Sequence, residues 1–228
     1  MSLIKFKELK YVSELNPSII GMITKPVEQF ERIRKKPLIW MAMGIVMVLY
    51  VIGMWLTMSN VDIAAEIAND TGVPLDDELM MIASAVEKLS IIIGGVISPL
   101  FGILLATIIH VLIAKMVEAK VTFRQLFSMN THITFITAIG IVLNGILYFV
   151  FNADSVHFYT SLGHYIQLDG AGGEIVNSIE IFSIWTVILT AIGLEKVAKM
   201  SRKLSWSIAI IIFLLGIITS IISLNMNG

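Results

Sequence analysis

Five long apolar blocks, separated by polar and charged segments, dominate the pattern of this chain. An α-helix needs about 20 apolar residues to cross a hydrocarbon core of roughly 30 Å, and each block has about that length. The pattern predicts an all-α membrane protein with a single five-transmembrane-helix bundle over residues 38–228. The predicted spans are 38–58, 89–114, 133–151, 175–194 and 206–224.

A short amphipathic helix is predicted near the end of the polar segment 1–37, just before the first block. Pro26 suits the first turn of a helix. Val27, Phe30 and Ile33 then recur every three residues and form one apolar face among charged neighbours. We expect this interfacial helix to lie on the inner leaflet, with basic side chains on anionic headgroups. Docking of a cytoplasmic partner is the alternative.

Positive charge is distributed unevenly over this predicted topology. Of the 16 Lys and Arg residues, only Lys88 lies outside the N-terminal segment and the loops on the same side. The opposite loops, about 59–88 and 152–174, are acidic. Cytoplasmic loops are enriched in Lys and Arg, so the N-terminus is predicted to be cytoplasmic and, after five crossings, the C-terminus outside. Residues 1–37 hold no signal-peptide core, so we expect an uncleaved multi-pass protein of the plasma or inner membrane.

Composition narrows the class of function. The chain is 57% hydrophobic and 14% charged, against about 25% charged residues in soluble domains. It has no cysteine, which excludes disulfides and thiolate chemistry. We find no phosphate-binding loop, no zinc-protease motif, no serine-hydrolase motif and no nucleic-acid-binding module. The sequence therefore predicts a protein that is not an enzyme, needs no cofactor and binds no nucleic acid.

The second predicted span carries small residues four positions apart. Gly94, Ser98, Gly102 and Ala106 fall on one helix face, where a second helix could approach closely. We expect this stripe to serve packing within the bundle, with a dimer interface as the alternative. His110, further along the same span, is expected to be a hydrogen-bonded packing residue rather than a ligand.

The most informative residue is the carboxylate of Glu180, which stands in a strongly apolar block. A charge in lipid is costly, so Glu180 should face protein, water or a partner, or else reach the outer interface. Ser183, Thr186 and Thr190 share its side of a helix and extend it into a polar stripe. Asn144 in the third span is expected to form a hydrogen bond across the bundle.

The second outer loop contains residues of the types that bind metals, although their spacing matches no metal motif. We therefore predict an ordinary polar loop and no metal site. The weak candidates for metal ligands are Asp154, His157, His164, Asp169 and Glu174.

One segment, residues 177–194 with the positions that follow, has a recognisable pattern: Glu180, Phe182, Ser183, Trp185, Gly193 and Leu194, followed by Lys196 and Lys199. This segment resembles the fourth span of bacterial Yip1-domain membrane proteins. In that family an acid precedes Phe-Ser-x-Trp, and the span ends in Gly-Leu followed by basic residues. The segment before the first span, from Lys25-Pro26 to Pro37, is also similar, and the resemblance covers roughly residues 22–224.

The resemblance implies a five-helix bundle with no established enzymatic activity. Eukaryotic relatives act in vesicle trafficking with small GTPases, but their N-terminal signatures are not evident here. Some bacterial members are accessory subunits of ABC exporters that use a periplasmic adaptor. Our first hypothesis is a non-catalytic accessory protein that assembles with or stabilises a membrane transport complex, possibly an ABC exporter, with a homo-oligomer also possible.

Two other functions are alternatives for this chain. A small autonomous transporter or channel would use Glu180 and Asn144 to line a polar path, although five spans without an inverted repeat do not favour it. An intramembrane enzyme would need paired carboxylates, a His-Glu pair or a serine with a base inside the bilayer. The sequence places only Glu180 there.

Overall fold

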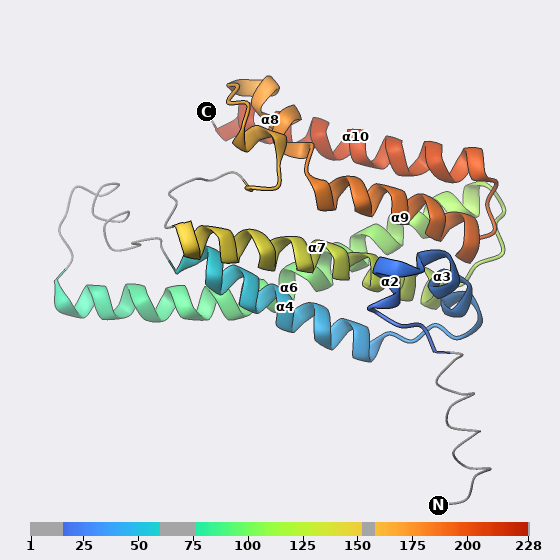
Figure 1. Cartoon of the computed structure of the whole chain (residues 1–228), viewed down its shortest axis with the longest axis horizontal. Coiled ribbons are helices and arrows are strands. Elements are labelled where there is room, and N and C mark those ends of the chain that lie inside the picture. The colour runs from blue at the N-terminus through green and yellow to red at the C-terminus, as the bar shows by residue number, and fades with distance from the viewer. Residues whose placement is uncertain (1–15, 60–75, 152–157, 228) are drawn as a thin grey trace, which may run out of the picture.

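The computed structural model describes residues 16–59, 76–151 and 158–227, and over these ranges the chain is a helical bundle (Figure 1). The described residues contain no strand beyond an isolated antiparallel bridge between Ser161 and Glu180. The elements are α2 (Gly21–Thr24), α3 (Pro26–Lys35), α4 (Trp40–Met58), α6 (Asp77–Met116), α7 (Phe123–Phe151), the 3-10 turn η1 (Leu162–His164), α8 (Gly170–Ser178), α9 (Ile181–Val197) and α10 (Arg202–Asn227).

Four of the described helices, α4, α6, α7 and α10, are long and apolar enough to cross a membrane. The prediction of five continuous spans needs correction at 175–194. The chain leaves the helical conformation there at Ile179 and Glu180, so that α8 ends and α9 begins. The remaining helix α9 has 17 residues, about 26 Å at 1.5 Å per residue, and is shorter than the hydrocarbon core.

Two of the long helices begin before the predicted spans because polar residues cap them. Helix α6 starts at Asp77, where the Asp76 side chain accepts a hydrogen bond from the Leu79 N–H at 2.9 Å. Helix α7 starts at Phe123, ten residues before the predicted position 133. Thr122 and Gln125 form a reciprocal capping box there, each side chain accepting from the other's backbone N–H at 3.2 and 2.9 Å.

Glycines allow the long helices to approach one another closely. A Cβ on Gly53 of α4 would lie 2.6 Å from the Ile141 side chain of α7, and one on Gly95 of α6 would lie 2.8 Å from the Val51 Cα of α4. A larger residue at either position would force these backbones apart. Helices α4, α6 and α7 therefore form one tightly packed layer, on which α9 and then α10 lie (Figure 1).

Helix α3 forms where the amphipathic helix was predicted, but its apolar face packs on protein. Phe30 and Ile33 are fully buried in the core, while Val27 is 43% exposed. The Arg34 guanidinium donates to the Val197 carbonyl of α9, and the Gln125 amide of α7 donates to the Arg34 carbonyl at 2.7 Å. The interfacial position of this helix on the inner leaflet stays a prediction, and its buried side chains contact protein instead of lipid.

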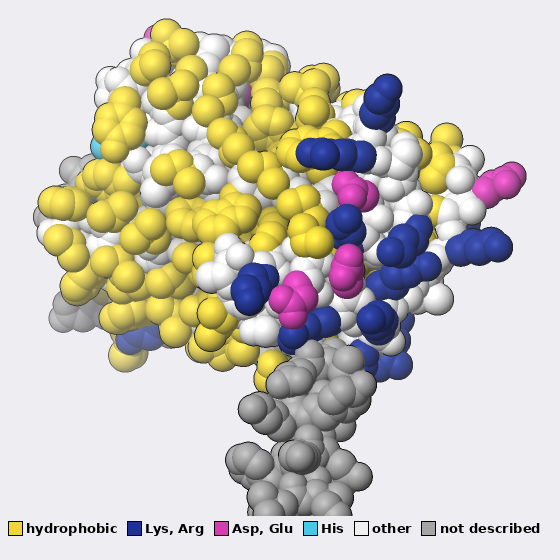
Figure 2. All heavy atoms as spheres, turned by 45° about the vertical axis from the view of Figure 1, so that its right-hand side comes forward, with side chains coloured by type: hydrophobic (Ala, Val, Ile, Leu, Met, Phe, Trp, Pro, Cys, Tyr) yellow, Lys and Arg dark blue, Asp and Glu magenta, His cyan; other side chains and the backbone are white. Residues whose placement is uncertain are grey.

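Charge and apolar surface separate along the molecule. Figure 2 shows hydrophobic side chains over much of the visible face and Lys and Arg gathered at one end. In Figure 1 this end holds α3 and the connections α6–α7 and α9–α10. We call it the basic end, made of Lys25, Arg32, Arg34, Lys35, Lys36, Lys115, Lys120, Arg124, Lys196, Lys199, Arg202 and Lys203.

Candidate functional site

The carboxylate of Glu180 is buried, 5% exposed, at the N-cap of α9, far from the basic end. Its Oε2 accepts from the Ser183 N–H at 2.7 Å, and its Oε1 accepts from the Thr160 hydroxyl at 2.6 Å. A carboxylate is favourable at this position because the first N–H groups of a helix lack partners and carry a partial positive charge. The cap also explains why the apolar block is broken at this residue.

Thr160 connects Glu180 to Asn144, a buried residue of α7. The Asn144 Nδ2 donates to the Thr160 Oγ1 at 2.7 Å and to the Gly140 carbonyl at 2.9 Å. The Asn144 Oδ1 accepts from the Thr160 N–H at 3.2 Å. The two polar residues that the sequence placed in different spans therefore belong to one network, which joins α7, the segment before η1 and α9.

Backbone hydrogen bonds reinforce this network. The Leu162 N–H donates to the Ile179 carbonyl at 2.8 Å, and the Ile181 N–H donates to the Thr160 carbonyl at 3.3 Å. Both carboxylate oxygens of Glu180 and both side-chain polar atoms of Asn144 have protein partners. The arrangement holds a loop onto two helices, and these atoms do not line an open polar path.

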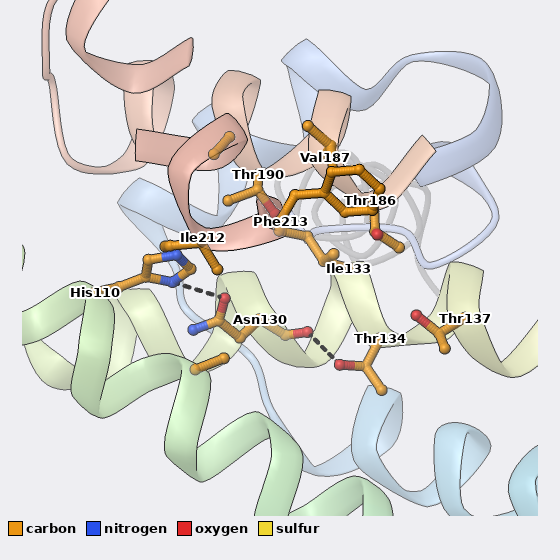
Figure 3. A pocket seen from close by; sticks show the side chains of 12 residues that line it. His110, Asn130, Ile133, Thr134, Thr137, Thr186, Val187, Thr190, Ile212 and Phe213 are labelled. Atoms are coloured by element: carbon orange, nitrogen blue, oxygen red, sulfur yellow. Dashed lines mark hydrogen bonds between the residues drawn. The ribbon is translucent and has the colours of Figure 1, made fainter. Parts of the chain in front are cut away.

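The polar stripe of α9 divides into two parts. Near the cap, the Ser183 N–H serves Glu180, and the Thr186 hydroxyl donates to the Ser183 carbonyl at 2.8 Å. Further along, Thr186 and Thr190 line a partly open cavity of about 280 Å³ between α6, α7, α9 and α10 (Figure 3).

A second buried polar group borders this cavity. The His110 Nδ1 lies 3.1 Å from the Asn130 Oδ1, and the Asn130 Nδ2 donates to the Thr107 hydroxyl at 2.9 Å. The Thr107 hydroxyl in turn donates to the Ile103 carbonyl at 2.6 Å. His110 thus has the hydrogen-bonded position that the sequence indicated, but its Nε2 is buried without a protein partner.

The small-residue stripe of α6 does not form one packing face within the chain. A Cβ on Gly94 would lie 2.8 Å from the Met54 side chain, and Ala106 lines the cavity. Ser98 is exposed, and a Cβ on Gly102 would meet no atom within 4 Å. The close contact with α4 is made at Gly95 instead, on the neighbouring face, so the middle of the predicted stripe faces outward.

The weak metal candidates do not converge in the part of the chain that the structure describes. Asp154 and His157 lie outside the described residues. The His164 ring packs on Tyr159, with centroids 4.3 Å apart, while Asp169 precedes α8 and Glu174 lies within it. Among the described residues, no three His, Asp or Glu side chains are placed to hold a metal ion.

The residues that resemble the family motif have identifiable packing roles. A Cβ on Gly140 of α7 would lie 2.8 Å from the Phe182 ring, and one on Gly193 would lie 2.8 Å from the Met129 sulfur and 3.3 Å from the Phe30 ring. Gly193 therefore allows α3 and α7 to meet α9 at the basic end. These residues of the motif therefore determine how α9 packs against α3 and α7.

Sequence reasoning missed Thr160 and Asn130, which complete the two polar groups. Thr160 follows no periodic pattern, and only the fold brings it between Asn144 and Glu180. Asn130 had a partial signal, since the capping box at 122–125 would have extended the third span back through it. It would then have counted as a polar residue inside a membrane helix.

Comparisons with known proteins agree with the resemblance. The Yip1 domain family model matches residues 20–224. The chain is 32% identical over 212 residues to the "Membrane protein YknW" of Bacillus subtilis (strain 168), covering 93% of this chain and 92% of that protein. No solved structure matches the chain significantly.

Proposed function

We propose a function from the premise that this chain belongs to the Yip1 family of membrane proteins. It is a non-catalytic integral membrane protein that assembles with, and stabilises, a membrane transport complex. A bacterial ABC exporter is the partner we put forward, because some bacterial members of the family that the chain resembles are accessory subunits of such exporters.

The outward-facing middle of the α6 stripe carries this proposal. Ser98 and Gly102 are exposed, and open space surrounds a Cβ built at Gly102. Small residues at this spacing favour close helix association in membranes, where apolar burial gives little driving force. A helix of another protein could pack closely against this face of α6, which no described helix of the bundle covers.

Helix α10 adds a second uncovered face. Of the most apolar stretch of α10, only 11% is buried, less than in α4, α6 or α7. Lipid alone would satisfy such a surface, so α10 permits partner binding without specifying it. The specific feature remains the stripe on α6.

The alternative function, a small transporter or channel, was suggested by a polar path through Glu180 and Asn144. A polar path through Glu180 and Asn144 requires side-chain atoms that water or a solute can reach. In the described structure these atoms bond to Thr160, Ser183 and Gly140. The accessory function needs no such path.

We further propose that the chain crosses the membrane five times, with a cytoplasmic N-terminus in a plasma or inner membrane. The concentration of Lys and Arg at the basic end supports this orientation. Helix α9 would be the short fourth span, since a short helix is accommodated by local thinning of the bilayer at modest cost.

The experiment is purification of the tagged full chain from cross-linked native membranes, comparing Gly102→Leu with the matched variant Gly44→Leu. Gly44 is exposed on α4, and a Cβ there also meets no atom within 4 Å. We expect Gly102→Leu to keep its thermal stability and lose the co-purified partner, while Gly44→Leu retains it. Equal partner recovery from both variants would count against the stripe.

A further inference from the structure

The cavity beside His110 has a polar wall and an apolar wall, which we consider together. Asn130, Thr134 and Thr137 of α7 and Thr190 of α9 provide the polar groups, while Ile212 and Phe213 of α10 face them (Figure 3). The volume of about 280 Å³ is close to the lower end of the range for small-molecule sites, roughly 300 Å³. The cavity therefore suits a group that is polar on one side and apolar on the other.

The direction of donation along these hydrogen bonds determines which ring nitrogen of His110 carries the proton. Since the Thr107 hydroxyl gives its proton to the Ile103 carbonyl, it accepts from the Asn130 amide nitrogen. The amide oxygen of Asn130 is then the atom next to His110, so the His110 Nδ1 must carry a proton and donate. In the neutral ring this leaves Nε2 as an acceptor.

That acceptor has no protein partner. His110 is 3% exposed, and its Nε2 is buried without a hydrogen bond. A buried polar atom left unpaired costs free energy comparable with a lost hydrogen bond, so such atoms in native proteins are normally paired with protein, ordered water or a bound molecule. A partner for this acceptor must be a donor, such as an O–H group.

The depth of the site indicates where this donor comes from. His110 lies five residues before Lys115 on α6, about 7.5 Å along the helix axis from the basic end. In the proposed topology the basic end lies at the membrane surface, so His110 lies just inside it, among the lipids. Helix α10 contributes only apolar side chains to the wall, which suits a hydrocarbon chain extending from the hydroxyl.

We propose that this cavity is a binding site for a neutral, hydroxyl-bearing amphipathic molecule of the membrane, with His110 Nε2 accepting its O–H and Ile212 and Phe213 contacting its hydrocarbon. The described side chains that line the cavity include no Asp, Glu, Lys or Arg. A charged headgroup would therefore lack a counter-ion there, and this selects a neutral alcohol over a phospholipid headgroup.

The test uses the full chain in nanodiscs with a photoreactive hexadecanol whose diazirine lies close to the hydroxyl. The matched probe is its methyl ether, which cannot donate a hydrogen bond. We expect light-driven cross-links from the alcohol to the segments 106–110 and 209–213, competed by unlabelled hexadecanol. The ether should label these two segments roughly fivefold less, because that is the change in affinity expected from the loss of one neutral hydrogen bond.

Variants separate the hydrogen bond from simple partitioning. His110→Phe keeps a ring but removes the acceptor, so labelling by the alcohol should fall to that by the ether, whereas Leu112→Phe at an exposed position on the same helix should preserve the preference. Thr190→Leu adds bulk to the cavity and keeps both residues of the His110–Asn130 hydrogen bond. It should reduce labelling by both probes, which covers the case that His110→Phe fails to fold. Equal labelling of wild type by the two probes, or a preference that survives in His110→Phe, would overturn the proposal.

Discussion

The Thr160 hydroxyl is what allows Asn144 and Glu180 to be buried together. It accepts from the Asn144 amide at 2.7 Å and donates to the Glu180 carboxylate at 2.6 Å, so one group satisfies both. An unpaired carboxylate or amide at this depth would carry a desolvation cost. At the scale of the residue, the network explains why the apolar helix α9 tolerates an acid at its start.

Thr160→Val should lower the free energy of unfolding by roughly 1 to 3 kcal/mol, because it leaves Glu180 Oε1 without its partner while conserving shape. Chemical denaturation of the purified protein in a mild detergent measures this. Thr219→Val is the matched control, since the Thr219 hydroxyl is exposed on α10 and bonds only the Gly216 carbonyl. A loss in Thr160→Val no larger than that in the control would contradict the bridging role.

The sequence anticipated part of this site. Glu180 and Asn144 could be singled out because polar residues in apolar blocks are conspicuous. Their connection could not be anticipated, because Thr160 is remote from both in the chain and belongs to a loop without periodicity. The sequence also predicted Glu180 inside a continuous span, whereas the structure places it at the N-cap of α9.

Among the helices, small residues determine which faces meet. The predicted stripe on α6 was a correct observation of spacing, but periodicity alone does not say which side of a helix faces the bundle. Gly95 meets α4 while Gly102 faces outward, only about two turns further on. Likewise, the start of α7 was missed because apolar length was used, whereas the capping box of Thr122 and Gln125 sets it.

Gly140→Leu should destabilise the protein by roughly 1 to 3 kcal/mol through overpacking, because its Cβ would already lie 2.8 Å from the Phe182 ring. Thermal unfolding followed by size-exclusion chromatography measures the effect. Adding Phe182→Ala should restore part of the stability, and Gly216→Leu, where a Cβ meets nothing within 4 Å, should be nearly silent. Absence of any rescue by Phe182→Ala would argue that α7 and α9 do not meet at this point.

At the scale of the whole molecule, the basic end and the uncovered faces define how the protein sits and what it contacts. Helix α3 docks on the bundle through Phe30 and Ile33, so the basic end is a packed unit. The chain contains no cysteine, so single cysteines report topology without background. The position of the α10 end distinguishes five crossings from four.

Gln167→Cys and Asn225→Cys should react with a membrane-impermeant maleimide on intact cells, and Met116→Cys only after permeabilisation. All three positions are exposed in the structure. This pattern follows from five crossings with a cytoplasmic basic end. Labelling of Gln167→Cys but not Asn225→Cys on intact cells would show that α9 does not cross and would reject the five-span proposal.

The accessory function is tested most directly by what the wild-type chain brings with it. The measurement is gentle purification from cross-linked native membranes, with the mass of the complex and the identity of its subunits determined. The account predicts stoichiometric recovery of a different integral membrane protein, with subunits of an ABC exporter as the specific expectation. Recovery of this chain alone, together with solute flux in liposomes that contain only this protein, would contradict it.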